Sequence, residues 1–442
     1  MSDFWNQQFE TMPWSDLHTY WLDKFNHLLS YVKTNSTFYA EHLEKVNAVS
    51  CFDELTKVPI MTKAEIREAQ LAGDRTMPLG TIQVAKSEDI VQVISSSGTT
   101  GRPVYYGVTQ KDLESWREAL AAFAYNAGIR KNDVVAHVVG TAIFAGGQPY
   151  FEGMRHIGAT VVWAGGLATE RLFETLRNMH CTAVLGTTSF DLYLAENCQK
   201  YLGIDARELG IKKILGGGEP GLGEEPIRNK MKDLWGADTV REVMGLADIM
   251  PGMWSECAEE KGMHFTAQPY VMVELTDPET GKHLPWEPGV CGEPIYTTIN
   301  REATPIVRYA SHDYIRVEAI ECSCGRTSPR MRCIGRVDDM LIYKAMNVFP
   351  SAIRDVVVKG FEEYLTGYIQ VVKDTALQVR FDDAIPVDIE VLPSVQNTKK
   401  LKQDIENKVR ELLVVKIEAN LVPPETIERT AYKTPLVRVR KK

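Results

Sequence analysis

The chain has 442 residues, of which 44% are hydrophobic and 25% charged, and its formal net charge is −9. This length exceeds one ordinary hydrophobic core, so two or three domains are expected. The negative charge argues against nucleic acid as a partner, and no apolar run approaches the roughly 20 residues that span a bilayer. Without a signal-peptide pattern at its start, the sequence predicts a cytoplasmic protein with no membrane partner. Eight dispersed cysteines favour reduced thiols or a metal site over a disulfide framework.

The first half of the chain contains a hydroxyl- and glycine-rich loop between two predicted elements. Residues 14–35 have apolar side chains at helical spacing and predict a helix that packs against a core. Residues 90–94 predict a buried strand, and Thr109 with Asp112 matches a capping box at the start of a helix. Between them, residues 95–103 offer donors and close backbone approach to an anion, which predicts a phosphate-binding loop. The loop lacks the Gly-Lys-Ser/Thr of a Walker A motif, and an ordinary polar turn is the alternative.

The rest of the chain divides into three regions with different predicted secondary structure. From residue 90 to about 243, short β-branched runs alternate with helical stretches, as in a mostly parallel sheet with covering helices whose ligands bind at strand ends. Residues 255–335 predict a small β subdomain. After Asp338, a strand-helix-strand-strand-helix-strand order predicts a small ferredoxin-like α+β domain. Its strands are expected at 340–343, 368–372, 377–381 and 417–422, and its helices at 351–358 and 398–413.

Several motifs follow one another in the order of a known family. They are Ser96–Pro103, Arg301–Tyr309, Cys322–Thr327, Gly335–Ile342 and Asn347–Pro350. On these motifs the chain resembles the phenylacetate-CoA ligase-like branch of the adenylate-forming acyl-CoA synthetase superfamily, from residue 59 onward. The resemblance implies an α/β N-terminal adenylation domain over residues 1–337 and a mobile C-terminal domain over 338–442, with its hinge at Asp338.

Such enzymes are acid-thiol ligases that run two half-reactions. A carboxylate attacks the α-phosphate of ATP to give an acyl-adenylate and pyrophosphate, and the thiol of coenzyme A then displaces AMP. The resemblance implies an aromatic or arylacetic acid as substrate, with ATP, Mg²⁺ and coenzyme A, and it is compatible with a homodimer. Two alternatives stay open: transfer to a carrier protein or another acceptor, and a nucleotide-binding regulatory protein that has lost catalysis.

The resemblance also implies roles for individual residues. Thr99 and Thr100 would contact the β- and γ-phosphates, and Lys433 would bridge the attacking carboxylate and the α-phosphate. Asp248 would offer an oxygen to Mg²⁺. The ribose hydroxyls would be accepted by the aspartate of the motif that ends at residue 313. The nucleotide-binding set is Ser96, Ser97, Gly98, Gly101, Gly217, Gly218, Glu219, Pro220, Met244, Gly245, Asp313 and Arg336.

Residues 216–221 also match Gly-x-Gly-x-x-Gly formally, but Glu219 would put a negative charge where a pyrophosphate lies, so an adenine-lining role or a tight turn is preferred. Three positions depart from the family pattern and motivate the alternatives. Met244 stands where a tyrosine stacks on adenine. Ala345, beside Lys344, replaces a glycine on the coenzyme A path, and Tyr432 replaces the glycine before the catalytic lysine.

Two further groups of residues are candidates for an acyl pocket and a metal site. The pocket loop, by resemblance, contains Phe144, Gly146, Gly147 and Tyr150, residues that suit a flat apolar acid and a packed turn equally. A structural zinc site of the Cys₃His type is expected from Cys257, His264, Cys322 and Cys324. Cys291 and Cys333 are alternative ligands, and unliganded thiols are the competing interpretation.

Overall fold

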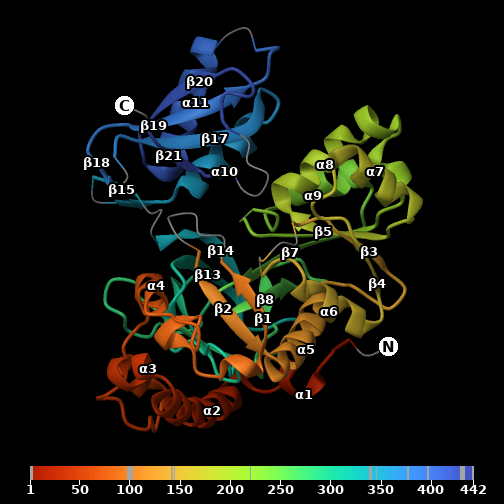
Figure 1. The fold of residues 1–442 in the computed structure, drawn as a ribbon. Coiled ribbons are helices and arrows are strands. Elements are labelled where there is room, and N and C mark those ends of the chain that lie inside the picture. Colours follow the sequence, from red (N-terminus) through yellow and green to blue (C-terminus); the bar gives the residue numbers. More distant parts are fainter. Residues whose placement is uncertain are drawn as a thin grey trace. The chain divides into compact units, whose positions relative to one another are not determined.

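The computed structural model divides into two compact units, each described by itself below. The first contains residues 1–218, 222–311 and 316–332, and the second contains residues 219–221, 312–315 and 333–442. The structure describes residues 3–96, 103–140, 143, 145–219, 221–337, 341–344, 346–375, 378–395, 398–428 and 434–440 (Figure 1). Among these residues, no helix combines the length and the apolar character that crossing a bilayer requires.

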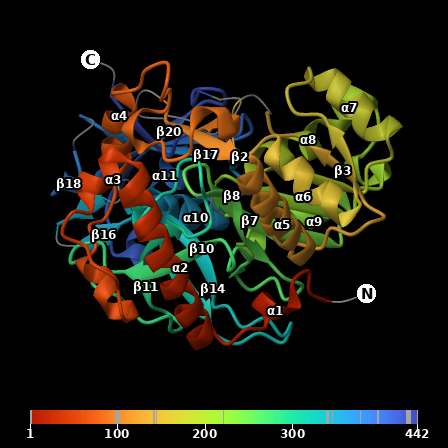
Figure 2. The same cartoon turned by 60° about the horizontal axis from the view of Figure 1, so that its bottom comes forward.

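The first unit begins with four α-helices, and the longest of them is the predicted packing helix. They are α1 (Gln7–Glu10), α2 (Trp14–Asn35), α3 (Thr37–His42) and α4 (Lys63–Leu71). Helix α2 has the predicted bounds, and Trp21 and Phe25 on its inner face are fully buried. The indole N–H of Trp21 donates to the carbonyl oxygen of Gln268 at 2.8 Å. This bond ties α2, the long red helix of Figure 2, to the segment that precedes strand β10 (Val271–Thr276).

The candidate phosphate loop connects two antiparallel strands, β1 (Ile90–Ser95) and β2 (Tyr105–Thr109). The predicted strand is present, but the prediction that it is buried is wrong, because Val91 and Val93 are 56% and 39% exposed. A two-stranded antiparallel sheet leaves one face to solvent, which explains this alternation. The loop therefore follows a hairpin strand, and not a strand of the parallel sheet as expected.

The predicted parallel sheet is present, with the order β4-β3-β5-β6-β7. Its strands are β3 (Val134–His137), β4 (Thr160–Trp163), β5 (Ala183–Thr187), β6 (Lys213–Gly217) and β7 (Thr239–Leu246). Figure 1 shows α7 to α9 on one face of these strands and α5 and α6 on the other. These helices are α5 (Gln110–Asn126), α6 (Pro149–Ile157), α7 (Thr169–Asn178), α8 (Thr188–Leu202) and α9 (Glu225–Trp235). The capping box of Thr109 and Asp112 at the start of α5 is confirmed.

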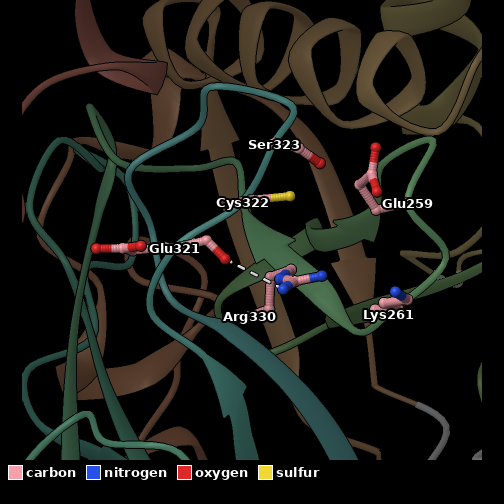
Figure 3. A pocket seen from close by; sticks show the side chains of 6 residues that line it. All are labelled: Glu259, Lys261, Glu321, Cys322, Ser323 and Arg330. Atoms are coloured by element: carbon pink, nitrogen blue, oxygen red, sulfur yellow. Dashed lines mark hydrogen bonds between the residues drawn. The ribbon is translucent and has the colours of Figure 1, made fainter.

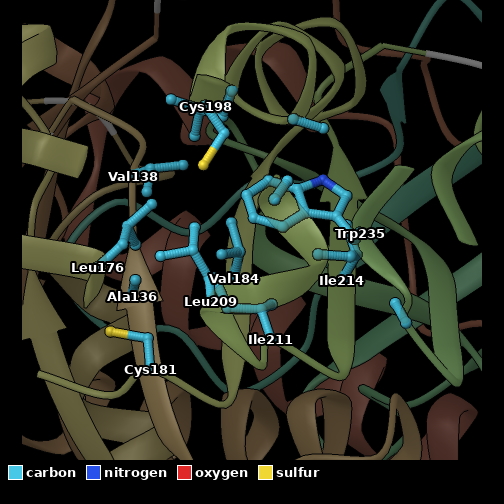
Figure 4. Packing of buried hydrophobic residues seen from close by; sticks show 14 of the residues in the cluster. Ala136, Val138, Leu176, Cys181, Val184, Cys198, Leu209, Ile211, Ile214 and Trp235 are labelled. Carbon is cyan, nitrogen blue, oxygen red and sulfur yellow. The ribbon is translucent and has the colours of Figure 1, made fainter. Parts of the chain in front are cut away.

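A buried apolar cluster fills the space between the parallel sheet and helices α7 to α9. Figure 4 shows Trp235 packed with Val184 and Ile214 from the sheet. Two of the eight cysteines, Cys181 and Cys198, lie in the same cluster, and burial raises the pKa of each thiol to about 11. These two cysteines therefore act as small core side chains.

The sheet continues beyond β7 with antiparallel strands in the order β7-β8-β9-β14-β13-β11-β10. The pairs β7 with β8, β8 with β9, β9 with β14 and β10 with β11 are antiparallel. Besides β10, the strands are β8 (Met250–Glu256), β9 (Met263–Phe265), β11 (Cys291–Thr298), β12 (Tyr309–Ala310), β13 (Asp313–Ala319) and β14 (Arg330–Arg336). The expected α/β class with a mostly parallel sheet in its first half is confirmed.

The second unit is a small α+β domain, as predicted, but one strand lies elsewhere. Its elements are β15 (Leu341–Tyr343), β16 (Met346–Val348), α10 (Pro350–Phe361), β17 (Leu365–Lys373), β18 (Arg380–Phe381), β19 (Ile385–Val391), α11 (Thr398–Leu413), β20 (Ile417–Val422) and β21 (Val437–Val439). The four-stranded sheet has the order β20-β19-β17-β21. The strand predicted at 377–381 shrinks to β18, which pairs with β15, and β19 takes its place in the sheet. Strand β19 contains Pro386, a residue that is uncommon inside a sheet because it cannot donate to the ladder.

Candidate active site

The base of the candidate phosphate loop is tied to the candidate acyl-pocket loop. The backbone N–H of Ser95 donates to the carbonyl oxygen of Ile143 at 2.8 Å, and the Gln92 amide donates to Gln148 Oε1 at 2.8 Å. Ser96 closes the base of the phosphate loop, with its N–H 3.0 Å from the carbonyl oxygen of Val104. The structure thus brings these two loops together. Ser97, Gly98, Thr99, Thr100, Gly101 and Phe144 lie outside the described residues.

The described part of the acyl-pocket loop packs on a buried histidine that sequence reasoning missed. His137 ends β3, and its Nε2 lies 3.0 Å from the carbonyl oxygen of Gly146. Burial lowers the pKa of His137 to about 4, so the imidazole is neutral near pH 7 and Nε2–H donates to that carbonyl oxygen. The buried ring of Tyr150 lies 5.9 Å from the His137 ring, and its hydroxyl donates to the carbonyl oxygen of Pro251. The hydrogen bond from His137 therefore fixes the position of the loop around Gly146 and Gly147.

Two glycines allow the ends of strands β6 and β7 to approach neighbouring backbone. A Cβ at Gly245 would lie 1.6 Å from the carbonyl oxygen of Pro251, and a Cβ at Gly217 would lie 2.4 Å from that of Val243. No side chain fits either position without moving backbone. Gly218 follows with φ +75°, as a tight turn between β6 and α9 requires. Met244 directly precedes Gly245 in β7 and pairs with Trp254 of the neighbouring strand. Pro220 lies outside the described residues.

Asp248, the predicted magnesium ligand, lies at the centre of a polar cluster. Its side chain is 8% exposed, and the Lys63 ammonium lies 3.2 Å from Oδ1 and 3.3 Å from Oδ2. The buried Tyr106 hydroxyl also donates to Oδ1, because burial raises the pKa of Tyr106 well above its ordinary value and keeps the phenol protonated. The guanidinium of Arg301 donates to the backbone carbonyl oxygen of Asp248 at 3.0 Å. The carboxylate is therefore held in one orientation.

The Arg301 side chain supports this cluster from beneath. Its guanidinium is buried and lies 5.2 Å from the centroid of the Tyr106 ring and 5.4 Å from that of the Trp116 ring. Such cation–π contacts stabilise a buried guanidinium that hydrogen bonds satisfy only in part. Arg301 and Lys63 both belong to segments that resemble the family, but the sequence offered no sign that they converge on Asp248, since 185 residues separate Lys63 from it.

The second unit contains the predicted ribose residues. Arg336 Nη1 lies 3.3 Å from Oδ1 of Asp313, and the backbone N–H of Val337 donates to the carbonyl oxygen of His312 at 2.7 Å. The two predicted residues are thus adjacent, with Asp313 buried and Arg336 partly exposed. Lys344 has a left-handed backbone with φ 57°, and its N–H donates to Phe381 at 2.9 Å. Glu219 is described in this unit, whereas Asp338, Ala345, Tyr432 and Lys433 lie outside the described residues.

The four predicted metal ligands come together in the first unit. The side-chain ligand atoms of Cys257, His264, Cys322 and Cys324 all lie within 4.8 Å of one another. The alternative ligands are elsewhere: the Cys291 thiol contacts the Gly289 carbonyl oxygen at 3.6 Å and the Cys333 thiol contacts that of Gly335 at 3.5 Å. The cluster has the donor types of a metal site.

Comparison with known proteins identifies the family. The sequence matches the family described as AMP-binding enzyme over residues 24–297 and the AMP-binding enzyme C-terminal domain over residues 345–440. The first match covers more than half of the chain, so the chain belongs to the AMP-binding enzyme family.

Individual relatives show which members of the family this chain is similar to. The phenylacetate-coenzyme A ligase of Thermus thermophilus is 28% identical over 96% of this chain and 96% of its own length. The enzyme of the same name from Pseudomonas putida is 31% identical over 79% and 77%. A crystal structure of 2-hydroxyisobutyryl-CoA ligase in the postadenylation state, in complex with 2-HIB-AMP, superposes with a TM-score of 0.89 at 25% identity, covering 100% of this chain and 93% of that one. The predicted phenylacetate-CoA ligase-like resemblance is confirmed.

Proposed function

We propose that this protein is an AMP-forming acid-thiol ligase that activates a carboxylic acid with ATP and transfers the acyl group to coenzyme A. The observation that carries the proposal is that one chain contains both family domains. In addition, the alignment with the Thermus thermophilus relative covers 96% of each of the two chains. The first half-reaction gathers anions and so needs fixed donors and cations near the α-phosphate. The polar cluster around Asp248 and the hydroxyl-rich loop of residues 95–103 provide such groups.

The proposed substrate is an aromatic or arylacetic acid. The relatives named phenylacetate-coenzyme A ligase support it, as do the aromatic side chains of Tyr150 and Phe151, which contact the His137 ring beside the candidate acyl-pocket loop. The relative named for 2-hydroxyisobutyryl-CoA makes a small aliphatic acid the first comparison substrate.

Asp248 is proposed to hold Mg²⁺ when the nucleotide binds. A carboxylate has about four lone-pair sites, and the contacts from Tyr106 and Lys63 leave capacity for a metal ion. Bound Mg²⁺ neutralises charge on the phosphates. Tyr106 and Arg301 keep the carboxylate oriented, and Lys63, which is 27% exposed, supplies a second cation at the same place.

The remaining residue roles are proposed from the family resemblance. Thr99 and Thr100 donate to the phosphates, and Lys433 stabilises charge at the α-phosphate during adenylation. Asp313 accepts the ribose hydroxyls with Arg336 beside it, a task that their 3.3 Å contact suits. A hinge at Asp338 would let the domain of residues 338–442 serve each half-reaction in turn. None of these steps uses the cysteine–histidine cluster, whose proposed zinc ion is structural.

Isotope exchange between pyrophosphate and ATP tests the first half-reaction with a panel of acids. Phenylacetate, benzoate, 2-hydroxyisobutyrate and malonate span aryl, small aliphatic and dicarboxylic chemistry. The proposal expects exchange with an arylacetic or aromatic acid that exceeds exchange with the other two. Exchange with an acid but no coenzyme A-dependent AMP release would favour a carrier protein as acceptor, which Ala345 motivates. No exchange with any acid, together with nucleotide binding, would favour the regulatory alternative that Met244 and Tyr432 motivate.

A further inference from the structure

The side chains of three cysteines and one histidine gather in the first unit, and their ligand atoms all lie within 4.8 Å of one another. Cys257 Sγ lies 3.7 Å from Cys322 Sγ, and Cys324 Sγ lies 3.4 Å from His264 Nε2. With Zn–S near 2.3 Å and Zn–N near 2.0 Å, tetrahedral ligand atoms stand about 3.5–3.8 Å apart. A disulfide would need sulfurs at about 2.05 Å. We propose that this cluster binds one structural zinc ion through Cys257, His264, Cys322 and Cys324.

The histidine is already oriented as a zinc ligand. His264 is fully buried in β9, and its Nδ1 lies 3.0 Å from the carbonyl oxygen of Ser328 and 3.1 Å from the Ser328 hydroxyl. A carbonyl oxygen only accepts, so Nδ1 carries the proton and the lone pair of Nε2 faces the thiols. Ligating histidines in metal sites are oriented by such a bond from the second ring nitrogen. A buried histidine in an apolar core would need no sulfur partners on its other side.

The cluster joins three separate pieces of chain. Cys257 follows β8, His264 lies in β9, and the other two thiols lie in the segment between β13 and β14. That segment has no strand or helix of its own from residue 320 to 329. A tetrahedral metal ion would cross-link it to the β8–β9 hairpin, as zinc does in small domains with little core.

The same segment also holds the start of the chain. Arg326 forms a buried ion pair with Glu10 at 2.7 Å, and a second N–H of its guanidinium donates to the carbonyl oxygen of Asp3 at 2.8 Å. The backbone N–H of Thr327 donates to the carbonyl oxygen of Glu10 at 3.1 Å. The ion that fixes Cys322 and Cys324 therefore also fixes the partners of residues 3–12. Loss of metal should loosen both segments together.

Two of the four ligands are partly exposed, and one of them lines a cavity. Cys322 lines a cavity of about 380 Å³ together with polar side chains, and Figure 3 shows its sulfur between Ser323 and Arg330. Cys257 and His264 are buried, whereas Cys322 and Cys324 are partly exposed. A chelator can reach the metal from this side without global unfolding.

Metal analysis of the full chain, purified without added chelator, tests the proposal. One zinc ion per chain is expected in the wild type and in the control variant Cys333→Ser, whose thiol lies outside the cluster. Cys322→Ser should bind much less. Cobalt added to chelator-treated wild type should give a thiolate-to-cobalt charge-transfer band and tetrahedral d–d bands.

A second measurement does not depend on how the variant folds. Chelator treatment of the wild type should increase proteolysis within residues 3–12 and 320–329. Zinc added back before the protease should restore the original resistance to cleavage. Wild-type chain that carries no zinc and takes up neither zinc nor cobalt would overturn the proposal, as would a Cys257–Cys322 disulfide found by mass spectrometry. Both readouts are independent of ligase activity.

Discussion

Replacing Asp248 with asparagine keeps the shape of the side chain and removes its charge. The amide oxygen can still accept from Tyr106, but the Lys63 ammonium then faces a group that cannot pair with its charge. Breaking a fully buried ion pair costs about 3–5 kcal/mol. Because the Lys63 side chain is 27% exposed and can turn to water, the loss should lie nearer the value for a hydrogen bond to a charged group, about 2 kcal/mol. The variant should therefore fold.

The effect of Asp248→Asn on catalysis should be larger than its effect on stability. If the carboxylate helps to place cationic charge at the phosphates, adenylation should fall by about 10²–10³, equivalent to about 2.7–4 kcal/mol in the transition state. The assay is acid-dependent pyrophosphate exchange at saturating ATP, run beside thermal unfolding. Asp23→Asn on α2, an exposed aspartate near His27, is the matched control and should change neither. Exchange by Asp248→Asn within about twofold of wild type would refute this reasoning.

Three further predictions concern the other candidate residues. Between pH 7.5 and about pH 5, the unfolding free energy of wild type should fall by about 2 kcal/mol more than that of His137→Gln. The reason is that the folded-state pKa of about 4 lies below the unfolded value of 6.5, so that only the unfolded state gains a proton in this range. Urea titrations in which the unfolding free energies of the two proteins change equally with pH would contradict this. The double variant Thr99→Ala, Thr100→Ala should slow adenylation by at least about 10² in pyrophosphate exchange, and near-normal exchange would remove the loop from the site. Lys433→Ala should abolish adenylation while sparing thioester formation from synthetic acyl-adenylate, and Asp338→Pro should do the reverse; equal loss of both steps in Lys433→Ala would contradict its assignment.

Local signals in the sequence predicted the elements that local physics decides. The periodic apolar side chains of 14–35 and 398–413 gave helices with the observed bounds, and the Thr109–Asp112 box gave the start of α5. Burial depends on partners that are not local. Strand β1 was misjudged because its hairpin partner follows the loop, which leaves Val91 and Val93 on an open face. The sequence analysis also missed strand β19, which contains Pro386, a residue that is uncommon inside a sheet.

The same distinction holds for the candidate site. The cysteine–histidine cluster could be predicted because its residue types are rare and chemically distinctive, so few combinations had to be considered. Lys63 and Arg301 are common charged residues, and their convergence on Asp248 depends on the path of the whole first unit. His137 looked like part of an apolar strand run, and its contacts with Gly146 and Tyr150, which the fold creates, link it to the acyl-pocket loop.

The most direct test of the proposed function is to observe both half-reactions in one sample. Wild-type chain is incubated with ATP, Mg²⁺ and the preferred acid of the panel, and the products are followed by mass spectrometry before and after coenzyme A is added. The account predicts an acyl-adenylate and pyrophosphate before the addition, then acyl-CoA and AMP in equal amounts after it. ADP and phosphate as products, or an acyl-adenylate that coenzyme A leaves unchanged, would contradict it.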